Sequence, residues 1–300
     1  SSPRLLTTMP ATPTIDPARR FGGVLMLLLA AALWSLSGLA VKVLKIDTPV
    51  ALAMWRSVGA AIAMLALLPL ARGHWPPMRW IALSILLHTA VVSLLIAAMT
   101  AGTAARGILL QYTGPAWCAL FALLLQRRTM GTPALISMGL CGVGTAFMLG
   151  GAEGESWFDR GTIFGLLSGV TFGGLILVLE MIDRRKANVD PVKIVLLNNA
   201  GTAVLLVPLV VLLGGLDLPM WKIGWVLALG VVQLAAPYWL FQHALRRVPA
   251  VDASLIIVLE PVLNPIWVWM AVSERPEPST LYGGGGVPAG AGGEARPRPT

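Results

Sequence analysis

Long runs of apolar residues, separated by short polar segments, occupy most of the chain. A transmembrane helix needs about 20 mostly apolar residues to cross ~30 Å of hydrocarbon, and nine runs reach this length. Lipid offers no hydrogen-bond partner to the backbone, so each run is predicted to be a helix. The predicted spans are Gly22–Leu44, Val50–Leu70, Trp80–Ala101, Ala105–Leu125, Thr132–Gly150, Gly161–Ile182, Val192–Leu213, Trp221–His243 and Val251–Val272. Because the connections are short, consecutive helices are expected to be antiparallel neighbours.

The Lys and Arg side chains are distributed unequally over the two sides of these helices. With the N-terminus in the cytoplasm, 13 of them fall on cytoplasmic segments and six on the opposite side, as the positive-inside rule requires. The acidic cluster Glu153, Glu155 and Asp159 then lies outside. The pattern therefore predicts a multi-pass protein of the cell inner (cytoplasmic) membrane with a cytoplasmic N-terminus.

The composition agrees with a bilayer environment. Of all residues, 56% are hydrophobic and 12% are charged, whereas a soluble domain carries about 25% charged residues. The net charge is +8, but the basic residues stand in short clusters between apolar runs, as expected of loops that face an anionic leaflet. The lipid bilayer, not nucleic acid, is therefore an expected partner. Cys118 and Cys141 lie inside apolar runs with no Cys-x-x-Cys pair, so we expect no disulfide and no metal site.

An internal repeat is visible when the chain is shifted against itself. A shift of 142 places Pro49-Val50 and Gly59 on Pro191-Val192 and Gly201, and a shift of 146 places Ala104, Leu109 and Pro115 on Ala250, Leu255 and Pro261. Both shifts map like spans onto like spans, the second onto the seventh and the fourth onto the ninth. Each half therefore has five spans, and since five is odd the second half is inverted in the membrane, as in many secondary transporters.

The repeat predicts an all-α, polytopic membrane protein of two inverted repeats of five helices. We expect a disordered N-terminal segment over residues 1–20, a first repeat of five spans over 21–151, a second repeat over 161–282 and a disordered tail rich in Gly and Pro over 283–300. The second repeat has only four recognisable spans. We therefore expect that the tenth helix is missing or altered.

Several short motifs carry a resemblance to a known family. They are, in the second half, Leu259-Glu260-Pro261-Val262-Leu263, Val272-Ser273-Glu274-Arg275-Pro276 and Leu281-Tyr282-Gly283-Gly284, and in the first half Ala31-Ala32-Leu33-Trp34-Ser35, Arg56 with Ala60, and Gln111-Tyr112-Thr113-Gly114-Pro115. In this order and spacing, from about Phe21 to Gly284, the chain resembles the EamA-type drug/metabolite transporters. The chain departs from the family pattern after the fourth span, where Gln126-Arg127-Arg128 replaces a Glu, while Glu274 is retained.

The resemblance implies ten helices, a central cavity between two five-helix repeats, and export of small metabolites such as amino acids. We therefore predict a gradient-driven secondary transporter that works by alternating access, binds a small-molecule substrate, acts as a monomer and needs no cofactor. A non-transporting membrane scaffold or receptor is the alternative. An intramembrane enzyme is a further alternative, but the chain has no His-Glu-x-x-His motif and no pair of aspartates within its spans. No Walker motif is present, which argues against ATP-driven transport by this chain.

Ionisable residues inside the spans are candidate site residues, because each costs about 2.5–3.5 kcal/mol or more in lipid. Arg56 could hold a substrate carboxylate, or it could snorkel to the membrane interface or pair with the C-terminus of a neighbouring helix. Glu260 could carry a proton or contact a substrate amine, or it could tie two helices together. His88, eight residues inside the third run, could face the cavity or be a packed, hydrogen-bonded residue.

Polar and aromatic side chains complete the predicted substrate site. Trp34, Tyr112, Tyr238 and Trp239 lie deep in their runs and could line an aromatic pocket, or they could serve packing or lipid contact. Gln111 joins them through the motif of the fourth span. Asn264 is expected to hydrogen-bond between helices. Pro115 and Pro261 are predicted hinges, because each removes one backbone hydrogen bond and bends its helix.

Overall fold

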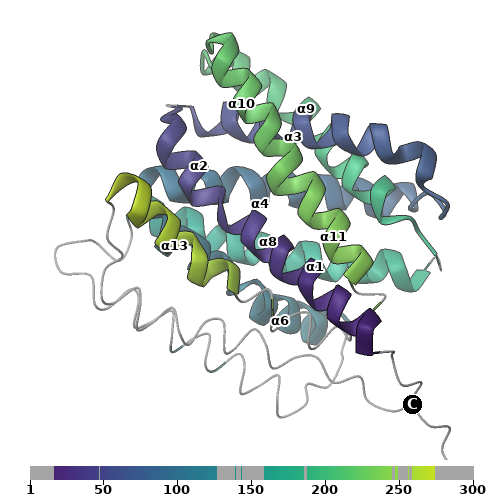
Figure 1. Ribbon diagram of the computed structural model, residues 1–300. Helices are drawn as coiled ribbons and strands as arrows, with labels where there is room; N and C mark the ends of the chain where they lie inside the picture. Colours follow the sequence, from purple (N-terminus) through teal and green to yellow (C-terminus); the bar gives the residue numbers. More distant parts are fainter. Residues whose placement is uncertain are drawn as a thin grey trace, which may run out of the picture.

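The computed structural model describes residues 17–46, 48–126, 139, 143, 159–185, 188–244, 247–248, 256 and 259–273. In these residues the chain is almost entirely helical (Figure 1). The elements are α1 Pro17–Ser35, α2 Ser37–Leu44, α3 Pro49–Leu67, the short 3-10 helix η1 Leu68–Leu70, α4 Met78–Ala101, α5 Ala104–Gln111, α6 Gly114–Gln126, α8 Arg160–Arg185, α9 Pro191–Leu212, α10 Met220–Gly230, the π-helical turn η2 Val231–Ala235, α11 Ala236–Ala244 and α13 Leu259–Val272.

Seven helical stretches of the described part are long and apolar enough to cross a membrane. They correspond to the predicted first to fourth and sixth to eighth spans, which confirms the multi-pass, all-α fold. The ninth span is described as α13, over Leu259–Val272. Most of the predicted fifth span, residues 1–16, the predicted C-terminal tail and the expected loss of the tenth helix lie outside the described residues. The prediction of disorder to residue 20 is wrong at its end, because Pro17–Arg20 form the first turn of α1.

Three of the spans are interrupted rather than continuous. The first is divided at Leu36 into α1 and α2, and the fourth is divided at Tyr112 and Thr113 into α5 and α6. The eighth contains the π-helical turn η2 between α10 and α11. Interruptions of this kind free backbone groups and are common at functional sites of membrane transporters.

The helix contacts obey the symmetry of the inverted repeat. The central pair is α3 with α9, the second and seventh spans. The second span packs on the eighth (α3 on α10), and the seventh packs on the third (α9 on α4). The third packs on the sixth (α4 on α8), and the eighth packs on the first (α11 on α1). Each of these contacts thus has a counterpart in the other half.

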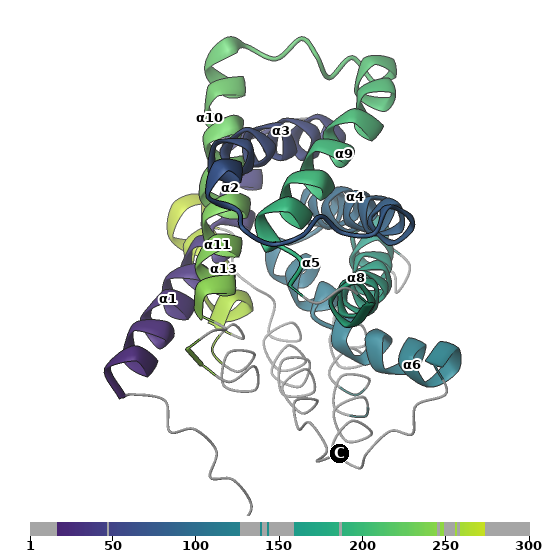
Figure 2. The same cartoon turned by 90° about the vertical axis from the view of Figure 1, so that its right-hand side faces the viewer.

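The helices form two bundles that exchange elements between the repeats. One bundle joins α4, α5 and α6 of the first repeat to α8 of the second, and the other joins α11 and α13 of the second repeat to α1 and α2 of the first. Figure 2 shows the two groups on either side of the molecule, with α3 crossing above them. Because α8 and α1 each serve the opposite repeat, neither half has its complete packing on its own.

Asp159 begins the sixth span and ties the two repeats together. Its Oδ1 accepts a hydrogen bond from the Thr162 amide at 3.0 Å, and its Oδ2 lies 3.5 Å from Nη1 of Arg106 on α5. Partial burial favours the neutral acid, but the hydrogen bonds from Thr162 and the charge of Arg106 outweigh it and lower the pKa of the Asp159 carboxyl. The result is an ion pair between the start of α8 and the start of α5.

Two glycines at equivalent positions allow the helices around the central pair to approach closely. A Cβ on Gly59 would overlap the carbonyl oxygen of Leu227 on α10, and one on Gly201 would lie 2.5 Å from Cγ2 of Ile85 on α4. The first contact is with backbone, which cannot rotate away. Side chains larger than hydrogen are therefore excluded at position 59.

Gly59→Ala is expected to lower the thermal unfolding temperature in detergent by several degrees, since overpacking of a tight site costs about 1–3 kcal/mol. Gly224 on α10 provides a control, because a Cβ there meets open space. Gly224→Ala should leave the unfolding temperature nearly unchanged. Equal unfolding temperatures for the two variants would contradict the close contact.

Candidate functional site

A carboxylate and a phenol from the two repeats meet where α5 packs against α13. The Tyr112 hydroxyl donates a hydrogen bond to Oε2 of Glu260 at 2.7 Å. Tyr112 lies at the interruption between α5 and α6, where the chain leaves the helical path, and Glu260 is the second residue of α13. Both side chains are half-buried. The contact joins the fourth span to the ninth, which the repeat relates to each other.

A second tyrosine lies near this carboxylate, and further aromatic rings pack against that tyrosine. Tyr238 of α11 lies within electrostatic range of Glu260. The ring of Trp34 on α1 meets Tyr238 edge to face with centroids 5.3 Å apart, and it lies 5.8 Å from the ring of Phe241. Ring faces are electronegative, so an aromatic wall beside a carboxylate favours a cationic group. We call Trp34, Tyr112, Tyr238 and Glu260 the central site.

Arg56 and His88 form a separate and deeply buried polar group. Each side chain is 4% exposed. His88 Nδ1 lies 3.0 Å from the Thr202 hydroxyl, and His88 is within electrostatic range of Arg56. Nε of Arg56 has no hydrogen-bond partner, and no acidic residue of the described part pairs with its guanidinium. The structure therefore does not bring these two predicted residues to the central site.

Gln111 makes an interhelical contact. Its Nε2 donates to the Ser168 hydroxyl at 3.2 Å, and that hydroxyl donates to the Val91 carbonyl at 3.3 Å. The side chain is 8% exposed and connects α5 to α8 and α4. Gln111 is thus adjacent in sequence to Tyr112 but faces the opposite way, into a helix contact.

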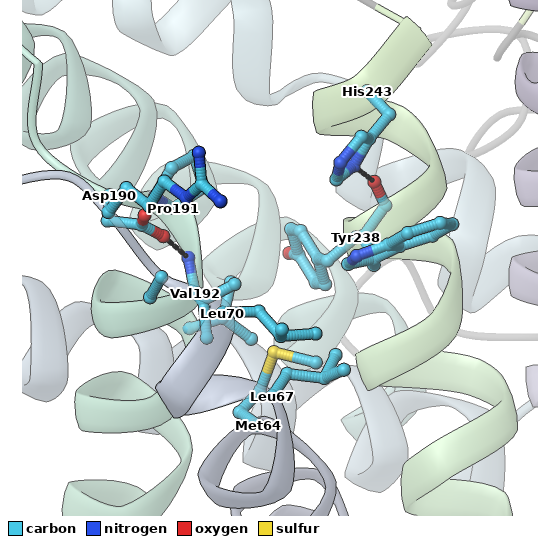
Figure 3. Close-up of a pocket in the computed structure, with 12 residues that line it drawn as sticks. Met64, Leu67, Leu70, Asp190, Pro191, Val192, Tyr238 and His243 are labelled. Carbon is cyan, nitrogen blue, oxygen red and sulfur yellow. Dashed lines mark hydrogen bonds between the residues drawn. The ribbon is translucent and has the colours of Figure 1, made fainter.

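A cleft of about 430 Å³ opens between α3, α9 and α11, beside the central site. Figure 3 shows how the labelled side chains converge on it from the three helices. Its lining residues are Met64, Leu67, Leu70, Ala71, Arg72, Asp190, Pro191, Val192, Val195, Tyr238, Trp239 and His243. Trp239 therefore lies at the cleft, where its carbonyl faces His243 Nδ1 at 2.8 Å. Tyr238 borders both the cleft and Glu260.

The predicted hinge prolines lie next to interruptions. Pro115 is the second residue of α6, directly after the break in the fourth span, and Pro261 is in the first turn of α13 as described. A proline in a first turn removes no helical hydrogen bond. Pro265 is the proline inside α13, and it was not among the predicted hinges. The hinge role of Pro115 and Pro261 stays a prediction.

Serines at the break in the first span were not identified from the sequence. Asn264 donates to the Ser37 hydroxyl at 3.1 Å, as an interhelical role for Asn264 requires, and Trp267 Nε1 donates to the Ser35 hydroxyl at 2.9 Å. Both bonds hold α13 against the divided first span. The sequence signal that could have identified them is the pair Ser35 and Ser37, which flank Leu36 inside the first apolar run.

Comparison with known proteins gives a consistent result. The profile of the EamA-like transporter family matches residues 21–150 and again residues 159–292. An uncharacterized transporter of Archaeoglobus fulgidus is 27% identical over 196 residues, which is 65% of this chain and 68% of that protein. A protein of known crystal structure superposes with a TM-score of 0.60 over 91% of this chain and 96% of its own, at 20% identity. At that identity the likeness concerns the fold alone.

Proposed function

The chain belongs to the EamA-like transporter family, and from this premise we propose that it is a gradient-driven secondary transporter. Its substrates are small amine-bearing metabolites such as amino acids, which it exports across the cytoplasmic membrane. Its N-terminus lies in the cytoplasm. The observation that carries the proposal is the hydrogen bond of 2.7 Å between Tyr112 and Glu260. It supports the proposal because it links a carboxylate of the second repeat to a phenol of the first, near the ring of Tyr238.

In the proposed cycle Glu260 exchanges a proton for the ammonium group of the substrate. The ionised carboxylate binds the ammonium, and Trp34 and Tyr238 offer it their rings. When the substrate leaves, Glu260 takes up a proton, so that a buried charge is never left without a partner. The Tyr112 hydroxyl can donate to the carboxylate in the ionised state and holds its orientation. Proton movement in one direction thereby drives substrate movement in the other.

Alternating access would come from motion of the two bundles about the central pair α3 and α9. Their contact at the break in the first span depends on the two hydrogen bonds from α13 to Ser35 and Ser37. Hydrogen bonds between membrane helices contribute only about 0.6–2 kcal/mol each. Bonds of this strength hold one state and can be exchanged for others during the cycle.

Flux into proteoliposomes tests the proposal. The purified full chain is reconstituted with an imposed pH gradient, and the uptake of a panel of labelled amino acids is measured against protein-free vesicles. We expect uptake of at least one of them that collapses when an ionophore removes the gradient. Binding without flux would instead indicate the receptor alternative, and the absence of both would refute amino acids as substrates.

A further inference from the structure

The cleft beside the central site has the size of a binding site. Its volume of about 430 Å³ lies within the range of about 300–1,000 Å³ that is usual for small-molecule sites. Its walls come from the end of α3, the start of α9 and from α11. These three elements belong to both repeats, so the shape of the cleft depends on how the repeats are placed (Figure 3).

One wall of the cleft is apolar and well packed. Met64 and Val195 are 2% and 9% exposed and belong to a hydrophobic cluster with Leu234. Leu67 and Tyr238 pack against this cluster and are half-buried, so they present apolar surface to the cleft. Such a wall suits an aliphatic or aromatic group of a ligand, because each buried CH₂ contributes about 0.8 kcal/mol.

The Asp190 carboxylate at the rim of the cleft already accepts two hydrogen bonds from the backbone. Oδ1 of Asp190 accepts from the Val192 amide at 2.9 Å and Oδ2 accepts from the Gly73 amide at 3.0 Å. The same loops are joined by hydrogen bonds from the His74 amide to the Asn188 carbonyl at 2.8 Å and from the Asp190 amide to the His74 carbonyl at 3.1 Å. Asp190 thus closes a rigid connection between two loops, and its two oxygens have structural partners.

Arg72 is a cationic residue that lines the cleft. It is exposed and directly precedes Gly73, which the Asp190 carboxylate holds in place. Among the described residues no acidic group pairs with its guanidinium. A guanidinium presents a planar set of donors that matches a carboxylate. The cleft therefore combines one free cation at its rim with an apolar wall below.

We infer that this cleft is a substrate subsite that selects small carboxylates with an apolar body, the carboxylate on Arg72 and the body against Leu67 and Val195. The inference rests on the proposed function, and it narrows the substrates to amino acids with branched or aromatic side chains. Tyr238 borders both places, so a molecule held in the cleft passes one side chain to reach Glu260. The apolar wall thereby sets specificity before the carboxylate of Glu260 takes the amine.

Four related probes separate the contributions of the carboxylate, the amine and the apolar part of the ligand. L-leucine carries the carboxylate, the amine and the apolar body; 4-methylpentanoate lacks the amine, 3-methylbutylamine lacks the carboxylate, and L-serine lacks the apolar body. Binding to the full chain in detergent is measured by calorimetry. We expect leucine and 4-methylpentanoate to bind, and serine to bind about tenfold or more weakly than leucine, a difference of about 1.4 kcal/mol.

Two variants and one control variant test whether the probes bind in the cleft. Arg72→Gln should weaken leucine and 4-methylpentanoate about tenfold and leave 3-methylbutylamine unchanged. Leu67→Trp should fill the cleft and abolish 4-methylpentanoate binding. Leu65→Trp adds the same ring two residues away at a position that is 58% exposed, and it should bind all probes like the unmodified chain.

The outcomes separate this inference from the proposed function. Equal binding of leucine and serine, or unchanged 4-methylpentanoate binding in Leu67→Trp, overturns the subsite even when amino-acid flux is present. Loss of binding in Leu65→Trp as well would show a general effect of the added ring, which also overturns it. Selective 4-methylpentanoate binding without any amino-acid flux would support the cleft and refute the transport cycle.

Discussion

Glu260→Gln is expected to reduce substrate flux by about tenfold or more and to remove its dependence on the pH gradient. The amide keeps the size of the carboxyl and can still accept the hydrogen bond from Tyr112, which is 2.7 Å long in the native chain. It can neither bind a proton in exchange for substrate nor balance the charge of an ammonium group. The fold should therefore persist while coupling is lost.

The measurement is uptake into proteoliposomes at a series of imposed pH gradients, together with counterflow at equal pH on both sides. Tyr112→Phe is the matched control, since it removes the hydroxyl and leaves the acid. We expect this variant to keep its response to the gradient with a moderately lower rate. An unchanged pH response in Glu260→Gln would exclude Glu260 as the proton carrier, and a lost response in Tyr112→Phe would assign the coupling to the pair.

The lengths and order of the spans were predictable because lipid imposes them. A run of about 20 apolar residues has no other folded state in a bilayer than a helix, and the seven spans of the described part follow the predicted ones closely. The inverted repeat was predictable from a few matched residues, such as Gly59 and Gly201. Each proves to lie where a neighbouring helix leaves no room for a Cβ.

The break in the first span was less predictable, because the groups that hold it are far apart in the sequence. It has no proline or glycine at Leu36; the serines on either side bond to Asn264 and Trp267, which are more than 200 residues away. The other two interruptions have a signal in the sequence. Gly114 and Pro115 directly follow the break at Tyr112 and Thr113, and Pro237 closely follows the π-helical turn at Val231–Ala235 and cannot donate a backbone hydrogen bond into it.

The central site was predictable in its members but not in its geometry. Tyr112 and Glu260 were both candidates, yet only the packing of α5 against α13 brings them together. Arg56, His88 and Gln111 were candidates for the same reason, polarity inside an apolar run, and they face helix contacts instead. A polar residue in a span is thus recognisable from the sequence as one that needs a partner. Whether it faces a cavity or another helix depends on how the neighbouring helices pack. A role of these three in transport stays a prediction.

Arg56→Met is expected to raise the thermal unfolding temperature by several degrees and to lower flux by about tenfold. An arginine at the middle of a membrane helix costs about 2.5–3.5 kcal/mol or more. Arg56 is 4% exposed and its Nε has no hydrogen-bond partner. Methionine fills similar space without a charge, so the folded state should gain stability. We expect the loss of flux because a charge kept at such a cost would serve a step of the transport cycle in which the guanidinium meets substrate or the opposite bundle.

Arg106 offers the matched comparison for Arg56, because it is equally buried but paired. It is 4% exposed, and its Nη1 lies 3.5 Å from the Asp159 carboxylate. Arg106→Met leaves that carboxylate without its cation and should lower the unfolding temperature; because the Asp159 side chain is 25% exposed, we expect a cost of about 1–3 kcal/mol. Opposite shifts in the two variants, measured in the same detergent, would support a functional Arg56. A shift of the same sign would show that Arg56 stabilises the fold, and full flux in Arg56→Met would exclude it from the transport cycle.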